Sequence, residues 1–434
     1  MVHCVEYGKE NGMPLKEMRS YLLLWLTQMI SGLGSAMTAY ALVIWSYTQE
    51  GSALRTALLM VCSYAPYVIC SIFAGALSDR WNKKKTMLVC DGLAALSTLV
   101  VLLLLKNDAL RIWHLYIVNA VSGLMNTFQQ PASEVATSAL LKREYYQRVG
   151  GLRYLSNALN SILTPIITTA IMALWGIGTV IAIDLCSFFV AFLVLLFFIP
   201  IPKTESRKQQ ESVLQSAAEG VRWLKANPGI FHLMLFLAGI NLVASMFNAA
   251  LPALALSKAS ERALGIVNAV TGITMLVGSI LASFIPAPRS RVKAIRYCLL
   301  MSMCTENFFL AFGNSTWVWC LGAFLGWIAI PLMSANLEAV NRLNIPMEIQ
   351  GRVYAARNSF QFFTIPVGYF LGGILVDEVF EPIMSLQTAD GLLAGLFGFG
   401  KGSGAAFLFA VLLLMGIAVC LLFRTDKEIW ELEK

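Results

Sequence analysis

Carboxyl groups inside long apolar segments are the side chains of this chain best suited to chemistry. Asp184 lies within the apolar segment 179–199, and Glu306 lies near the middle of segment 295–312. A charge at the centre of a bilayer costs at least about 2.5 kcal/mol, so such residues are candidates for function. Proton coupling requires a buried carboxyl that loads and releases a proton in the physiological range. We therefore interpret Asp184 and Glu306 as candidate proton-coupling residues; the alternative is a structural contact with a neighbouring helix.

Polar side chains also line up on single faces of four further apolar segments, because residues three, four or seven apart share a helical face. These stripes predict either interhelical hydrogen bonds, worth about 0.6 kcal/mol each, or the walls of one central cavity. We favour the cavity, whose amide-rich lining suits a bulky, amphipathic ligand. Its predicted substrate-binding residues are Gln28, Ser35, Asn119, Asn126, Gln129, Asn241, Asn248, Trp327 and Asn336.

The elements that must position these residues are membrane-spanning helices. Crossing a hydrocarbon core of about 30 Å takes about 20 helical residues. Twelve apolar segments are close to that length: 20–45, 54–77, 86–105, 112–140, 152–174, 179–199, 230–256, 264–285, 295–312, 317–340, 353–376 and 404–423. We therefore predict an all-α membrane protein with 12 transmembrane helices.

Lys and Arg are unevenly distributed between the alternate loops that join these segments. Most of the 32 basic residues lie in the termini and the even-numbered loops, and the other side holds only Arg55, Lys106, Arg111, Lys258, Arg262 and Lys401. By the positive-inside rule, both termini and the central loop are cytoplasmic. The sequence thus predicts a multi-pass protein of the plasma (inner) membrane, in contact with membrane lipid.

Composition excludes several classes of function. The chain is 58% hydrophobic and 13% charged, against about 25% charged for soluble domains, which leaves no room for a large aqueous domain. The net charge of +7 is accounted for by the cytoplasmic loops, so we expect no nucleic-acid partner. The nine cysteines lie singly and the three histidines are scattered, without metal or redox spacing. We expect no metal, no cofactor and no enzyme activity.

The chain divides into two similar halves. The long polar connection near 201–228 separates six apolar segments from six others, and its second part, 213–226, is amphipathic and is expected along the membrane surface. The fifth segment contains Asn157, Asn160 and Pro165. The eleventh segment contains Asn358, Gln361 and Pro366 with the same spacing. This supports duplication about an axis along the membrane normal. We predict an N-terminal six-helix bundle (1–200), a cytoplasmic linker (201–228) and a C-terminal six-helix bundle (229–434).

The loop GALSDRWNKKK, residues 75–85, resembles the signature loop of the major facilitator superfamily. Gly75, Asp79, Arg80, Lys83 and Lys84 occupy its expected positions, and Asn82 replaces the usual Gly, where we expect a left-handed turn. The resemblance implies that Asp79 faces the N-terminus of the eleventh helix, whose dipole favours an anion.

The same resemblance implies that Lys83 pairs with Glu134. We group Asp91 and Glu134 with the basic residues of the loop as gating residues. The alternative is that the basic residues only fix the topology.

A closer resemblance extends over TQMISGLGSAMTAYALVIW (27–45), the run from 75 to 96 and IDLCSFFVAFL (183–193). These stretches are similar to the macrolide-efflux branch of the superfamily, which also includes siderophore exporters. The resemblance implies the major facilitator fold, two pseudo-symmetric six-helix bundles and alternating access. It also implies a monomer that exports hydrophobic or amphipathic small molecules in exchange for protons.

The open alternatives are uptake, lipid or siderophore transport, and a non-transporting sensor or assembly partner. Residues 377–404 are expected as a mobile, Gly-rich connector, which is also the candidate surface for such a partner.

Overall fold

The computed structural model describes residues 15–140, 146–201, 213–346, 349–388 and 390–433. Helices account for the secondary structure of these residues, and no strand occurs among them. In a bilayer each backbone N–H and C=O must find a partner inside the protein, which a helix achieves within one segment. The expected all-α fold is therefore confirmed.

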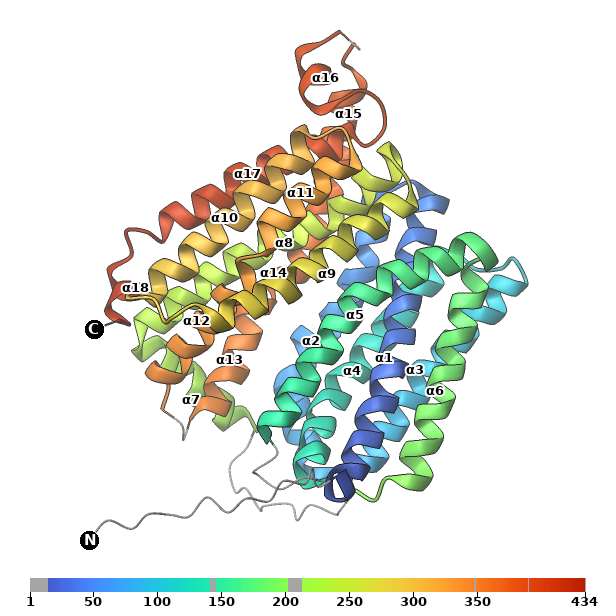
Figure 1. The fold of residues 1–434 in the computed structure, drawn as a ribbon, viewed down its shortest axis with the longest axis vertical. Coiled ribbons are helices and arrows are strands. Elements are labelled where there is room, and N and C mark those ends of the chain that lie inside the picture. The colour runs from blue at the N-terminus through green and yellow to red at the C-terminus, as the bar shows by residue number, and fades with distance from the viewer. Residues whose placement is uncertain (1–14, 141–145, 202–212, 347–348, 389, 434) are drawn as a thin grey trace.

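Six helices form the first half of the assembly (Figure 1). Within it α2 packs against α4, α1 against α6, and α3 against both α4 and α6. Their bounds are α1 Leu15–Glu50, α2 Ala53–Arg80, α3 Lys83–Lys106, α4 Ile112–Leu140, α5 Tyr146–Trp175 and α6 Ile177–Phe198. Helix α2 joins α1 at one end and α3 at the other. We therefore call the two ends of the molecule the α1–α2 end and the α2–α3 end.

The second half contains two broken helices. The unbroken ones are α8 Pro228–Lys258, α9 Glu261–Phe284, α10 Arg291–Phe312 and α17 Ser403–Leu422, and the short α18 Lys427–Glu431 follows α17. The tenth apolar segment is divided into α11 Thr316–Trp327 and α12 Ile330–Asn344, and the eleventh into α13 Gln350–Phe362 and α14 Thr364–Ile374. Pro331 and Pro366 lie just beyond the two breaks, and each lacks the N–H that would continue the helix ladder.

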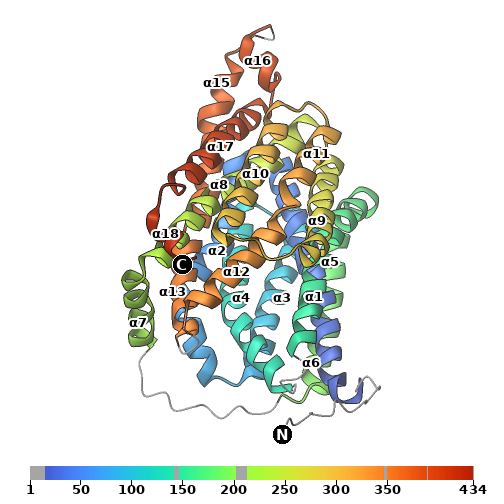
Figure 2. The ribbon, with the colours of Figure 1, turned by 60° about the vertical axis from the view of Figure 1, so that its left-hand side comes forward.

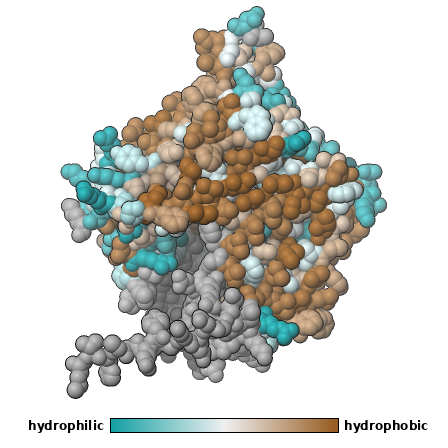
Figure 3. Space-filling view, in the orientation of Figure 1, coloured by the Kyte–Doolittle hydropathy of each residue, from teal (hydrophilic) through white to brown (hydrophobic). Residues whose placement is uncertain are grey.

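All twelve predicted apolar segments are helical, but ten helices among the described residues are long and apolar enough to cross a membrane by length and composition. The other two are α4 and α10. Helix α4 carries a stripe of amides. Helix α10 has three basic residues among its first six and contains Glu306. Apolar side chains cover much of the visible face (Figure 3), as expected where helices meet lipid.

Three local expectations need correction. The predicted connector at 377–404 is largely helical, with the π-helix η2 Leu375–Phe380 followed by α15 Glu381–Ser385 and α16 Leu392–Phe397. Phe397 holds α16 in place by stacking on Phe312 and Phe407, with ring centroids 5.5 and 4.9 Å away. Asn82 is not left-handed: at φ −68° it caps α3, and its side chain accepts a hydrogen bond from the backbone N–H of Lys85 at 3.0 Å.

The third correction concerns the amphipathic helix α7 Val213–Ala226, which packs on α13 (Figure 2). Its Leu224 is 1% exposed and belongs to an apolar cluster with Ile345 and Val353. Protein, not only the membrane surface, therefore covers the apolar face of this helix.

Glycines allow the closest approaches between helices, as is common where small residues form the interface. A Cβ built on Gly123 of α4 would lie 2.1 Å from the backbone oxygen of Ser63 in α2. Similarly, a Cβ on Gly272 of α9 would lie 3.0 Å from the backbone of Ser161 in α5. The first contact lies within the first half and the second joins the two halves.

We predict that Gly123→Ala destabilises the protein, because the added methyl group would overlap a backbone atom that has no rotamer to change. Overpacking of this kind costs about 1–3 kcal/mol. The measurement is the unfolding temperature of the purified protein in detergent. Gly92→Ala in α3 is the matched control, since a Cβ there meets nothing within 4 Å. Equal unfolding temperatures for the two variants would contradict the close packing of α2 on α4.

Candidate functional site

A cavity of about 1040 Å³ opens among the helices of the first half. The described residues that line it come from α1 to α6, and we call it the first-half cavity. Its volume matches the upper range for sites that bind drug-sized ligands, about 300–1,000 Å³. The sequence predicts a cavity lined by four segments, two from each half. The described lining of the first-half cavity comes from one half only.

Two of the predicted polar stripes, on α1 and on α4, line this cavity. The α1 stripe contributes Gln28, Ser31, Ser35 and Thr38, and the α4 stripe contributes Asn119, Ser122, Asn126 and Gln129. All eight side chains are among the lining residues because helical periodicity places each set on one face. Asn126 keeps an exposed side chain that is available to a ligand.

Asp91 of α3 connects these two walls. One of its carboxylate oxygens accepts a hydrogen bond from the side-chain amide of Gln28 at 3.5 Å, and the other accepts from the amide of Gln129. From the sequence, Asp91 is expected among the gating residues near the signature loop. Its described hydrogen bonds place it on the cavity wall between two neutral amides.

Asp184 of α6 also lines this cavity and is 4% exposed. Its Oδ1 accepts a hydrogen bond from Ser35 Oγ at 3.0 Å. The close approach of α1 to α6 depends on Gly34, where a Cβ would lie 2.6 Å from Ser187 Oγ and 3.0 Å from the Asp184 Cα. Asp184 thus lines the cavity while its carboxylate is held by a hydroxyl of the neighbouring helix.

The charges lining the first-half cavity do not balance. Among the described lining residues, Arg153 is the sole cation, and it forms an ion pair with Glu134 at 3.0 Å. The hydrogen-bond partners that the structure records for Asp91 and Asp184 are uncharged. Carboxylates in a poorly solvated space are stabilised by any positive charge that enters, either a proton or a cationic ligand.

The predicted substrate residues of the second half do not line the first-half cavity. Three amides there donate to backbone carbonyl groups: Asn241 to Gln361 at 3.1 Å, Asn248 to Ala244 at 2.9 Å and Asn336 to Leu332 at 2.8 Å. The last two bonds stay within one helical turn, and Asn336 is 3% exposed. Trp327 is half-buried against the apolar core of the second half.

Glu306 is also remote from the first-half cavity. It is 5% exposed in α10, and a Cβ on Gly326 of α11 would lie 2.8 Å from the Glu306 Cβ. Its surroundings are therefore protein side chains packed at van der Waals distance.

The signature loop is described only in part. The side chains of Asp79 and Arg80 lie outside the described residues, as does their predicted contact with the eleventh helix, and Gly75 is placed only as part of the α2 backbone. Lys83 is 6% exposed and donates to the Trp81 carbonyl at 3.3 Å. Lys84 donates to the carbonyl groups of Ile199 and Leu196 at 2.9 and 3.0 Å, which satisfies the C-terminal end of α6.

The wall formed by α5 was not predicted as part of the site. Asn157, Asn160 and Arg153 of α5 line the first-half cavity, as do Tyr21 and Trp25 of α1. The indole N–H of Trp25 donates to the Leu152 carbonyl at 3.2 Å and so ties α1 to α5. The three-residue spacing of Asn157 and Asn160, which puts both amides on one face of α5, is the sequence signal that indicates this wall.

Comparison with known proteins agrees with this architecture. The chain is 24% identical over 368 residues to macrolide efflux protein A of Streptococcus pyogenes, covering 83% of this chain and 90% of that protein. It is 23% identical over 322 residues to the enterobactin exporter EntS of Citrobacter koseri, covering 73% of this chain and 75% of the exporter.

Solved structures that share the fold include the following two. One is the nucleoside transporter NupG (D323A mutant), with a TM-score of 0.68, 12% identity and coverage of 93% of this chain and 99% of that one. The other is a bacterial homologue of the iron transporter ferroportin in the inward-facing state, with a TM-score of 0.69, 14% identity and coverage of 96% and 99%. At these identities the likeness concerns the fold alone.

A family model described as Major Facilitator Superfamily matches residues 24–282, more than half of the chain. That match joins the helical fold, the apolar spans and the polar cavity into one conclusion: the chain belongs to the major facilitator superfamily, and it is a multi-pass membrane transporter and not an enzyme.

Proposed function

We propose that this transporter exports hydrophobic or amphipathic small molecules that carry a positive charge, in exchange for protons and by alternating access. The relatives named for macrolide efflux and for enterobactin export support the export of bulky organic molecules. The positive charge is our inference from the cavity itself. The partners of the protein are then a small-molecule substrate, protons and the surrounding lipid, and its expected state is a monomer.

The observation that carries this proposal is the lining of the first-half cavity. It combines room for a drug-sized molecule, amides on two walls, and the carboxyl groups of Asp91 and Asp184 without a described cationic partner. A neutral sugar would leave both carboxyl groups uncompensated, and an anion would be repelled. A lipophilic cation satisfies the carboxylates and fills the apolar remainder of the cavity.

Exchange with protons follows if proton and substrate compete for the same carboxyl group. Asp184 suits this role because it is 4% exposed yet lines the cavity. Glu306 is the second candidate, since it is 5% exposed inside the second half. In our proposal the substrate contacts Asp184 directly. The substrate does not contact Glu306 and affects its protonation only through movement of the helices.

The direction of transport rests on topology. We place the protein in the plasma (inner) membrane. By the positive-inside rule, its α2–α3 end and both termini face the cytoplasm. Export then requires a substrate to enter the first-half cavity from the cytoplasmic side. Uptake on the same fold is the rival, and the sign of substrate movement in oriented vesicles decides between them.

Charge selectivity is the most direct test of the proposed substrate class. Tetraphenylphosphonium and tetraphenylborate have the same shape and opposite charge, so their comparison isolates electrostatics from apolar contact. We expect the purified protein to bind the cation at least about tenfold more tightly, which corresponds to about 1.4 kcal/mol, as measured by isothermal titration calorimetry. Equal affinities, or preference for the anion, would exclude a cation site.

The location of the site is tested by one substitution made in two places. Asn126→Leu removes an amide from the first-half cavity, whereas Asn248→Leu removes one that donates to its own helix at 2.9 Å outside it. We expect Asn126→Leu to weaken tetraphenylphosphonium binding about tenfold and Asn248→Leu to leave it within twofold (about 0.4 kcal/mol). Weakening by both variants would instead support a cavity shared by the halves. Indifference to both would favour a protein that does not transport.

Coupling is tested by proton release. Adding tetraphenylphosphonium to purified protein in weak buffer should release protons, which a pH-sensitive dye detects. We expect Asp184→Asn to abolish this release, because the competing carboxyl group is gone, and Glu306→Gln to retain it. The reverse result would move coupling to Glu306, and unchanged release in both variants would remove both residues from the proposal.

A further inference from the structure

The two halves of the transporter meet at the α1–α2 end around the start of α2. Helix α1 ends at Glu50, Gly51 turns the chain with φ +61°, and α2 begins at Ala53. The first N–H groups of a helix have no partner within it. Ser52 satisfies one of them, since its Oγ accepts from the Arg55 N–H at 3.1 Å. The preceding two N–H groups need another acceptor.

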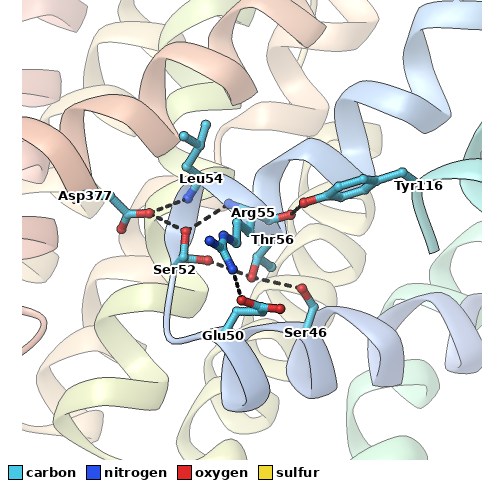
Figure 4. Close-up of polar contacts among 8 residues, drawn as sticks. All are labelled: Ser46, Glu50, Ser52, Leu54, Arg55, Thr56, Tyr116 and Asp377. Atoms are coloured by element: carbon cyan, nitrogen blue, oxygen red, sulfur yellow. Dashed lines mark hydrogen bonds and ion pairs between the residues drawn. The ribbon is translucent and has the colours of Figure 1, made fainter. Parts of the chain in front are cut away.

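That acceptor comes from the other half of the chain. The Asp377 carboxylate in η2 accepts hydrogen bonds from the N–H of Leu54 at 2.9 Å and the hydroxyl of Ser52 at 2.6 Å (Figure 4). It also accepts one from the N–H of Ala53 at 3.0 Å. These bonds span more than 300 residues of sequence. A charged acceptor makes them stronger than bonds between neutral groups, and the dipole of α2 adds further attraction for an anion.

The backbone around Asp377 is shaped for this contact. One turn earlier, a Cβ on Gly373 would lie 2.5 Å from the Leu54 Cα, so no larger residue allows α14 to come this close to α2. The chain then passes into the six-residue π-helix η2, a conformation that is rare and frequent at functional sites. Glycine brings the two backbones together, and the carboxylate binds the exposed helix end.

The start of α2 is firmly attached to its own half. The Tyr116 hydroxyl of α4 donates to the Arg55 carbonyl at 3.0 Å, and the hydroxyls of Ser46 and Thr56 lie 3.4 Å apart (Figure 4). A force on the α2 start is therefore transmitted to α1 and α4. Other contacts between the halves lie near this end, including Tyr47 Oη to Ser257 Oγ at 2.6 Å.

A second carboxylate shows the same chemistry without joining the halves. Glu381, one turn after Asp377, accepts from the Gly402 N–H at 2.8 Å, just before α17 begins. Both α15 and α17 belong to the second half. Glu381 therefore caps a helix within one half, whereas Asp377 caps a helix of the other half. Comparing variants of these two residues distinguishes the effect of losing a helix cap from the effect of losing a contact between the halves.

We propose that Asp377, the α2 start and Gly373 form a latch that holds the α1–α2 end of the transporter closed and must open once in each transport cycle. Asp377 is thus a positioning residue that sets the balance between the two access states. This inference rests on the alternating access in our proposed function. Alternation requires contacts that form in one state and break in the other, and helix-end hydrogen bonds from another half can break without unfolding either bundle.

The test measures how readily the closed end opens. Ala53 is 1% exposed and contributes only its backbone N–H to the latch, so Ala53→Cys places a reporter under it. The reporter is introduced after the nine native cysteines are replaced by alanine. The readout is the rate at which a charged, membrane-impermeant maleimide modifies this cysteine in nanodiscs. We expect Asp377→Asn to raise the rate about fivefold or more.

Two further variants make the result specific. Gly373→Ala should also raise the rate, because its methyl group would push the α2 backbone away. Glu381→Gln should lower the unfolding temperature about as much as Asp377→Asn while leaving the rate within twofold of the parent. If Asp377→Asn only lowers the unfolding temperature and the rate is unchanged, Asp377 is a structural cap and the latch is wrong.

The same samples separate failure of the latch from failure of the proposed function. A raised rate in Asp377→Asn, with no binding of tetraphenylphosphonium by the parent, would leave the latch standing and remove the proposed substrate class. Normal tetraphenylphosphonium binding by the parent, with an unchanged labelling rate in Asp377→Asn, would contradict the latch and leave the proposed substrate class standing.

Discussion

Every part of this structure depends on the rule that backbone N–H and C=O groups have no water to bind inside a bilayer. The rule makes the apolar segments helical, and it also dictates what happens where helices end. Lys84 serves the last carbonyl groups of α6, Glu381 the N–H before α17, and Asp377 the first N–H groups of α2. Asp377 belongs to the other half of the chain. The hydrogen bonds that cap α2 therefore also join the two halves.

The two halves use similar polar residues differently. In the first half, the amides of α1 and α4 face the first-half cavity, and those of Gln28 and Gln129 bind Asp91. In the second half, Asn248 and Asn336 donate to carbonyl groups of their own helices. Asn119 of the first half makes the same kind of bond, to the Leu115 carbonyl at 2.9 Å, although it lines the first-half cavity. The two halves therefore differ in which amides line this cavity and not in the bonds that these amides make within their helices.

Much of the architecture was accessible from local patterns. Length and hydropathy located all twelve helical segments, and three-to-four spacing put the α1 and α4 stripes on single faces. Patterns of this kind did not reveal the break near Phe363, the ordered helices after Asp377 or the capping role of Asn82. Those features depend on which neighbour supplies a partner or occupies space, and spacing along one helix carries no information about the next.

The sequence by itself determined the class of protein, the helical segments, the faces that carry polar groups and the resemblance to one superfamily, because each follows from periodicity or from a contiguous motif. Only the tertiary structure decided which polar faces share a cavity, that the recorded hydrogen-bond partners of Asp91 and Asp184 in it are uncharged, and that Asp377 caps a helix more than 300 residues away. Cavities and contacts between distant segments arise from the packing angles of whole helices. Those angles are set by close contacts, such as that of Gly123 with Ser63, whose partners are far apart in the chain.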